Sequence, residues 1–246
     1  MDTIKIQGKK TKMIAHRGVS GLERENTCPA FVAAGNRSYF GIETDIQALP
    51  DGTFIAMHDD DTARLFQYKS NVNVRNNTWD NLKDIVLPDL DGSLDRRDIR
   101  IPTLRDYVSI CKKYEKTCIL EVKNVFSKQN IARMVEEIRA LDYLDGVIFI
   151  SIEYENCVNL RALLPDAKIQ YLTGQRMDDE VIRMLTSIHV DAGVDIDFAN
   201  PARNKERLDR LHALGIEVNF CTCDDPTLAR ELIDLGADYL TSNILE

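Results

Sequence analysis

Two histidines and a pair of carboxylates stand close together near the start of the sequence. His16 and His58 flank Glu43 and Asp45, which are two residues apart in a segment that resembles a strand. Side chains two apart on a strand share a face, so both carboxylates are expected to point the same way. Neighbouring carboxylates repel each other and favour either a shared proton or a bound cation. Two imidazoles beside such a cation could perform acid–base chemistry on a phosphate ester.

A third carboxylate lies on a later apolar segment, where Glu121 and Lys123 are two residues apart. Charges on an apolar strand carry a desolvation cost unless they find partners. Together with Glu43 and Asp45, Glu121 would suit one divalent cation that prefers oxygen ligands, Mg²⁺ or Ca²⁺. Zinc is less expected, because no closed set of cysteines and histidines is visible. A purely structural ion pair between Glu121 and Lys123 is the alternative.

The elements that must position these residues alternate regularly between strands and helices. Apolar strand-like runs are expected to end near residues 16, 45, 123, 151, 173, 195, 222 and 242, with helical patterns between most of them. Eight such units in 246 residues predict a (β/α)8 TIM barrel, one catalytic domain over residues 1–246. An open doubly wound sheet is the alternative, which the lack of a glycine-rich phosphate loop disfavours.

One segment departs from this alternation. Asp51-Gly52 is typical of a hairpin turn that would return the chain, as a strand, toward His58. Residues 60–100 are polar and contain the only tryptophan, so we expect a small insertion after the second strand with its own hydrophobic cluster. The run Asp59-Asp60-Asp61 is expected to be a solvated helix start, and Pro201 is expected to begin a later helix.

The bulk composition limits the partners. A net charge of −9 argues against a nucleic-acid or anionic-membrane surface. No apolar run is long enough to cross a bilayer and no signal peptide is visible, so we expect a cytoplasmic protein without a membrane anchor. The six cysteines are expected to be buried free thiols. A redox or metal pair at Cys221 and Cys223 is the less favoured alternative.

Several motifs, taken in order, resemble the glycerophosphodiester phosphodiesterase family, in the superfamily of phosphatidylinositol phospholipase C-like phosphodiesterases. They are His16-Arg17-Gly18, Glu25-Asn26-Thr27, Glu43-Thr44-Asp45, Asp51-Gly52, His58-Asp59, Ile101-Pro102-Thr103-Leu104, Glu121-Val122-Lys123 and, more loosely, residues 236–243. The resemblance implies a TIM barrel with a small insertion after the second strand. It also implies that a small-molecule glycerophosphodiester is hydrolysed to glycerol 3-phosphate and an alcohol.

The same resemblance assigns roles to individual residues. It implies one divalent cation held by Glu43, Asp45 and Glu121, with His16 and His58 as the general acid/base pair. Arg17 and Lys123 are implied to contact the phosphate, where they would neutralise charge on the phosphoryl oxygens.

One departure from the family concerns the substrate pocket. Family members often carry tryptophan near the seventh strand, where this chain has Phe220-Cys221-Thr222, and we expect Phe220 to contact the substrate. Two other functions stay open: a sphingomyelinase-like phospholipase D, which would need an apolar rim facing a membrane, and a non-catalytic barrel that binds phosphodiesters. The sequence leaves open the preferred alcohol, the nucleophile and the oligomeric state.

Overall fold

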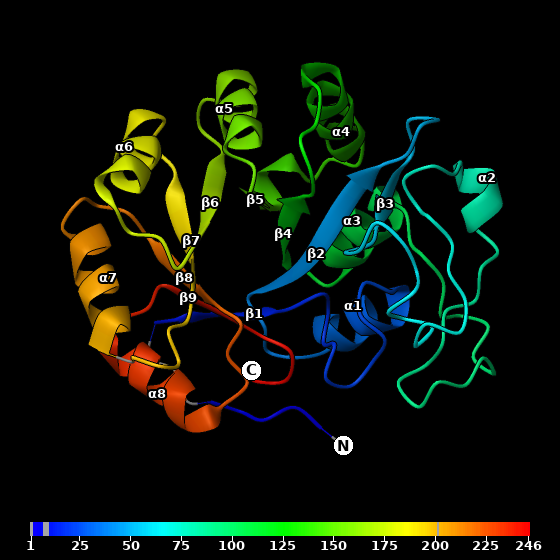
Figure 1. The fold of residues 1–246 in the computed structure, drawn as a ribbon, viewed down its shortest axis with the longest axis horizontal. Coiled ribbons are helices and arrows are strands. Elements are labelled where there is room, and N and C mark those ends of the chain that lie inside the picture. The colour runs from blue at the N-terminus through cyan, green and yellow to red at the C-terminus, as the bar shows by residue number, and fades with distance from the viewer. Residues whose placement is uncertain (1, 7–9, 201) are drawn as a thin grey trace.

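The computed structural model describes residues 2–6, 10–200 and 202–246. Within these residues nine strands form one sheet in the order β1-β9-β8-β7-β6-β5-β4-β2-β3. All pairings are parallel except β2–β3, and β1 also pairs with β2, which closes eight parallel strands into a barrel (Figure 1). The strands are β1 (Lys12–Ala15), β2 (Gly41–Ala48), β3 (Phe54–Ala56), β4 (Thr117–Val122), β5 (Val147–Ser151), β6 (Lys168–Gly174), β7 (Asp191–Asp195), β8 (Val218–Cys221) and β9 (Tyr239–Ser242). The predicted TIM barrel is confirmed, and the open sheet is excluded.

Helices surround the barrel (Figure 1). Those described are α1 (Cys28–Gly35), α2 (Trp79–Leu82), α3 (Leu104–Lys113), α4 (Lys128–Ala140), α5 (Tyr154–Leu163), α6 (Asp179–Ser187), α7 (Ala202–His212) and α8 (Pro226–Leu235), with a 3₁₀ turn η1 (Leu144–Gly146). Side-chain caps fix several starts: Thr27 accepts from the N–H of Ala30, and Thr103 forms a reciprocal capping box with Asp106. The expected helix start at Pro201 lies outside the described residues.

Alternation along the strands divides the core into two layers. Residues such as Ile14 and Ile119 point into the barrel and pack with Ile148, Ile150 and Tyr239. Their sequence neighbours point outward into a larger cluster between strands and helices. On β2, Ile42 and Ile46 join the outer cluster, so Glu43 and Asp45, which alternate with them, face the barrel interior as expected.

The hairpin and the segment after it also follow the prediction. β3 returns antiparallel to β2, and residues 57–103 leave the barrel before α3 begins (Figure 1). This insertion has a separate buried cluster, which it shares with the hairpin: Leu49, Ile55, Met57, Leu65, Val74, Leu82, Leu87, Ile99 and Ile101.

Two further expectations can be compared with the structure. No helix begins at Asp59-Asp60-Asp61, so that prediction was wrong; the side chain of Asp59 instead bonds to His58 and Arg64. All six cysteines are free thiols, four of them buried and Cys28 and Cys221 half-buried. In the described part of the chain, no helix combines the length and apolar character needed to cross a bilayer.

Candidate active site

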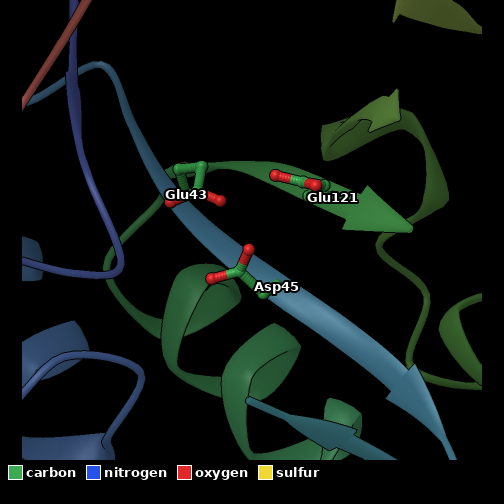
Figure 2. Close-up of side chains that lie close together, drawn as sticks. All are labelled: Glu43, Asp45 and Glu121. Atoms are coloured by element: carbon green, nitrogen blue, oxygen red, sulfur yellow. The ribbon is translucent and has the colours of Figure 1, made fainter. Parts of the chain in front are cut away.

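Three carboxylates meet inside the barrel near the C-terminal ends of two neighbouring strands. Glu43 and Asp45 come from β2 and Glu121 from β4, where Asp45 and Glu121 are direct partners in the strand register. Each offers an oxygen within 4.8 Å of the others, and Figure 2 shows the three side chains lying close together. Glu43 and Asp45 are 3% and 1% exposed. Strand pairing alone therefore assembles a buried cluster of negative charge.

The three acidic groups of this cluster lie close enough to repel one another. Burial, followed by the nearby charges of Asp45 and Glu121, raises the pKa of Glu43 well above its usual value. Burial and Asp45 likewise raise the pKa of Glu121. Buried carboxylates are stable when paired or when they coordinate a metal, and oxygen-only ligands match Mg²⁺ or Ca²⁺. The donor set thus fits one divalent cation held by Glu43, Asp45 and Glu121.

The loop after β1 wraps around the same carboxylates. The backbone N–H of Arg17 donates to Glu43 Oε2 at 2.7 Å. Its guanidinium contacts Glu25 Oε1 at 2.9 Å and Asp45 Oδ2 at 3.3 Å. The next residue, Gly18, has φ +75°, and a Cβ there would lie 2.6 Å from a side chain of α1. Glycine therefore lets the loop turn tightly against α1 and present Arg17 to the site.

Asn26 ties this loop to β2. Its Nδ2 donates to Asp45 Oδ2 at 2.8 Å, and its Oδ1 accepts from the Thr44 hydroxyl at 2.7 Å. Its backbone N–H donates to the carbonyl of Arg17. With 3% exposure, Asn26 fixes which face of Asp45 stays available to a ligand, a role that spacing did not reveal.

Lys123 lies just beyond β4 and faces the same cluster. Its Nζ is 2.9 Å from Glu121 Oε1 and 3.5 Å from Asp45 Oδ1. Burial lowers the pKa of Lys123, but Glu121 and Asp45 outweigh it, so the net pKa is raised. Lys123 is therefore a charged ammonium at the mouth. Because it contacts Asp45 as well as Glu121, Lys123 belongs to the carboxylate cluster and not to an isolated pair with Glu121.

His16 follows β1 and bonds to a residue at the far end of the sequence. Its Nδ1 lies 2.7 Å from Asn243 Oδ1, and its Nε2 lies 4.0 Å from Glu43 Oε2. Its backbone N–H donates to the carbonyl of Ser242. Burial, and then the neighbouring charge of Arg17, lowers the pKa of His16. A neutral imidazole is thus favoured beside the carboxylates.

His58 reaches the site through the hairpin. The N–H of Met57 donates to the carbonyl of Asp45, which places His58 beside that strand. Gln47 Nε2 donates to the carbonyls of Met57 and Asp59, at 2.8 and 2.9 Å, and so holds the backbone on both sides of His58. The ring Nδ1 is 2.6 Å from Asp59 Oδ1. Asp59 thus occupies Nδ1, and the other ring nitrogen, Nε2, is left for a different partner.

Arg64, from the insertion, bridges the two halves of the site. It makes two bonds of 2.8 Å to Glu25 and one of 2.6 Å to Asp59 Oδ2. Burial alone would raise the pKa of Glu25, but Arg64 and Arg17 lower it to about 2. Glu25 and Asp59 are therefore anions that connect Arg17 on one side to His58 on the other.

The structure corrects the expected position of one residue. Phe220 is fully buried and packs in the outer layer between strands and helices, so it does not face the mouth. Its neighbour Asn219 bonds to Gln170 and Thr241 within the barrel, and Cys221 shares that face by strand alternation. Burial and nearby carboxylates raise the pKa of the half-buried Cys221 thiol. By this alternation Cys221, rather than Phe220, is the residue at the C-terminal end of β8 whose side chain faces the barrel interior.

The remaining candidates converge. The metal-binding candidates Glu43, Asp45 and Glu121 contact Arg17, Lys123 or His16 directly, while His58 is placed beside them by the hairpin. Sequence reasoning gave no role to Glu25, Asn26, Asp59, Arg64 or Asn243. Glu25, Asn26 and Asp59 lie inside motifs of the resemblance, and Asn243 ends its loosest one, residues 236–243. Nothing local marks Arg64.

Known proteins resemble this chain in sequence and in fold. The sequence pattern of the Glycerophosphoryl diester phosphodiesterase family matches residues 16–245. The chain belongs to this family. The resemblance inferred from the motifs and the enzyme class that it implied are thereby confirmed. Among curated proteins, the chain is 25% identical to a glycerophosphodiester phosphodiesterase of Bacillus altitudinis, over 93% of this chain and 92% of that protein. It is 27% identical to the uncharacterized protein YqiK of Bacillus subtilis, over 96% of each.

Solved structures of this family have the same fold. An Oleispira antarctica phosphodiesterase in complex with the product sn-glycerol-3-phosphate superposes with a TM-score of 0.82 at 23% identity, over 95% of this chain and 93% of that chain. A glycerophosphodiester phosphodiesterase from Parabacteroides distasonis gives 0.77 at 24% identity, over 96% and 94%.

Proposed function

We propose that this protein hydrolyses glycerophosphodiesters to glycerol 3-phosphate and an alcohol, using His16 and His58 as the acid–base pair and one divalent cation. The observation that carries the proposal is the convergence of two histidines, three carboxylates and two basic side chains at one end of the barrel. A barrel that only binds phosphodiesters has no need of two histidines whose Nδ1 atoms are held by oxygen acceptors.

Glu43, Asp45 and Glu121 would hold the cation, Mg²⁺ or Ca²⁺. When bound, it would supply positive charge to the phosphoryl oxygens. Arg17 and Lys123 add two positive charges beside the same carboxylates, and a phosphate oriented by both would lose much of its repulsion toward a nucleophile.

The two histidines are suited to different steps. His16 is favoured as neutral, and its Nδ1 faces Asn243 Oδ1, so its Nε2 can accept a proton from the attacking hydroxyl. His58 Nδ1 lies against the Asp59 carboxylate, which orients the ring so that Nε2 can donate a proton to the departing alkoxide. We therefore assign His16 as general base and His58 as general acid.

The deciding experiment measures glycerol 3-phosphate released from glycerophosphocholine, glycerophosphoethanolamine and glycerophosphoglycerol, each with Mg²⁺, with Ca²⁺ and with a chelator. We expect metal-dependent release that falls about 10²–10⁴-fold in His16→Ala and in His58→Ala. His189→Ala is the matched control, because His189 is exposed and precedes β7, at the opposite end of the barrel from the strand ends that carry the site. Metal binding without release from any diester would contradict the proposal.

The expected setting of this reaction belongs to the same proposal. The partner would be a small-molecule substrate and the location cytoplasmic. Fractionation of cells that express the tagged protein tests the location, and metal titration of the purified protein distinguishes Mg²⁺ from Ca²⁺.

A further inference from the structure

The hydrogen bond of His16 extends beyond Asn243 to a second acidic residue. Asn243 Nδ2 donates to Asp224 Oδ2 at 2.6 Å, and the backbone N–H of Asn243 donates to Asp224 Oδ1 at 2.8 Å. The Ser242 hydroxyl also donates to Asp224 Oδ1 at 2.8 Å. Asp224 lies in the loop after β8 and Asn243 directly after β9. The ends of three strands, β8, β9 and β1, are thus linked by one chain of hydrogen bonds.

The chemistry of these groups fixes where each proton lies. An ionised carboxylate only accepts hydrogen bonds, so the Asn243 atom that faces Asp224 must be the amide nitrogen. The amide oxygen is then turned toward His16, and a second donor, the Ser20 hydroxyl, reaches the same oxygen at 2.6 Å. An amide oxygen also only accepts, so His16 Nδ1 must carry the hydrogen.

We propose that Asp224 and Asn243 are positioning residues that hold the His16 ring with its hydrogen on Nδ1 and so keep Nε2 free to accept a proton. The proposal deepens the proposed function, on which it rests. It differs from the arrangement at His58, whose ring contacts a carboxylate directly. At His16 a neutral amide stands between ring and carboxylate, which orients the ring without placing an anion against it.

A single substitution, Asp224→Asn, should reverse the orientation of the Asn243 amide. In Asp224→Asn, an amide group can replace Oδ2, and two N–H groups would then face each other unless the Asn243 amide turns over. A turned amide presents its nitrogen to His16, which then has to accept at Nδ1 and carry its hydrogen on Nε2, the wrong tautomer for a base. The exchange Asp224→Asn with Asn243→Asp restores the pattern, because the new amide donates to the new carboxylate, which still accepts from His16.

The control is Asp225→Asn, the same change one residue further on. Asp225 caps α8 through the N–H groups of Thr227 and Leu228, and asparagine serves that role about as well. Asp225 makes none of the bonds in the Asp224–Asn243–His16 chain. The His16 tautomer and the kcat of the Asp225→Asn variant should therefore match those of the wild type.

The first test is the ring ¹⁵N NMR spectrum of His16, assigned with His16→Ala and recorded in metal-free protein at a pH where the ring is neutral. We expect the Nδ1–H tautomer in the wild type and in the double exchange, and the Nε2–H tautomer in Asp224→Asn. An unchanged tautomer in Asp224→Asn would overturn the proposal. This readout needs no substrate, so it stands even if the wild type hydrolyses none of the diesters, a result that would count against the proposed function alone.

The second test is kinetic. With an active wild type, Asp224→Asn should lower kcat about tenfold or more while KM stays within about twofold, since the substrate contacts are intact. The double exchange places a carboxylate against His16, which favours the protonated ring. Its kcat is therefore compared on the high-pH plateau of the pH–rate profile, where it should recover most of the loss. A double exchange no faster than Asp224→Asn, although it folds and binds metal normally, would show that the two residues act separately and would overturn the proposal.

Discussion

Replacing Glu43 by glutamine should stabilise the metal-free protein and abolish its stabilisation by metal. Glu43, Asp45 and Glu121 offer oxygens within 4.8 Å of one another. At an effective dielectric constant of about 20, two unit charges at that separation repel by about 3 kcal/mol. Protonation of Glu43, whose pKa is raised, relieves part of this repulsion in the wild type. We therefore expect Glu43→Gln to gain about 1–3 kcal/mol, or roughly 3–10 °C in Tm.

The pH dependence of this gain follows from the same carboxyl. Its folded-state pKa lies above the usual 4.5, so the folded chain holds the Glu43 proton more tightly than the unfolded chain does. The stability linked to this proton is present below pH 4.5 and is lost as the pH rises through the raised value. Wild-type protein in a chelator should lose this contribution across that interval, whereas Glu43→Gln should not. The advantage of the variant should therefore grow toward neutral and alkaline pH.

Thermal unfolding with chelator and with Mg²⁺ or Ca²⁺ measures both effects. At a metal concentration of 100 times Kd, the wild type should gain about 2.7 kcal/mol, and Glu43→Gln should gain little. Glu231→Gln makes the same change at an exposed position on α8 and should change neither value. A metal-free Glu43→Gln protein that is less stable than the wild type, or a variant that metal still stabilises fully, would refute this account of the cluster.

Three further substitutions test other parts of the site. Asp59→Asn removes the anion beside His58 and should lower kcat about tenfold or more with metal affinity unchanged, which a metal titration beside the kinetics would check. Gly18→Ala places a Cβ against α1 at φ +75° and should cost about 1–3 kcal/mol of stability in denaturant unfolding, and a neutral result would contradict the tight turn. Phe220→Leu should lower the free energy of unfolding by about 1 kcal/mol but leave the order of preference among the diesters unchanged. Cys221→Ala should change that order of preference. The opposite result for the two variants would show that Phe220 contacts the substrate.

The sequence predicted most of the fold because strand and helix periodicity is a local signal. Strand alternation correctly put Glu43 and Asp45 on one face, and the buried run around Glu121 correctly indicated a neighbouring strand end. The prediction that Phe220 contacts the substrate was wrong by a single position along β8. The departure from the family covered Phe220 and Cys221 together, and a shift of one residue along a strand moves a side chain to the opposite face.

The site contacts that were not predicted from the sequence depend on how the folded chain brings residues together. Asp59 lies in a run of acids that is typical of a helix start, but its carboxylate is occupied by His58 and Arg64. Asn243 meets His16 across 227 positions in the sequence. No periodicity or short spacing encodes such a contact, because closure of the barrel alone brings the two residues together.

The pairing of β1 with both β2 and β9 has a consequence for synthesis and folding. During synthesis Glu43, Asp45 and Glu121 are made well before the Asn243 partner of His16, which follows β9. Contacts between such distant segments form late and carry the largest loop-closure entropy. Catalytic competence should therefore appear only when β9 docks, which makes turnover a kinetic probe of the last step of folding. During refolding from denaturant, recovery of helical signal should precede recovery of activity.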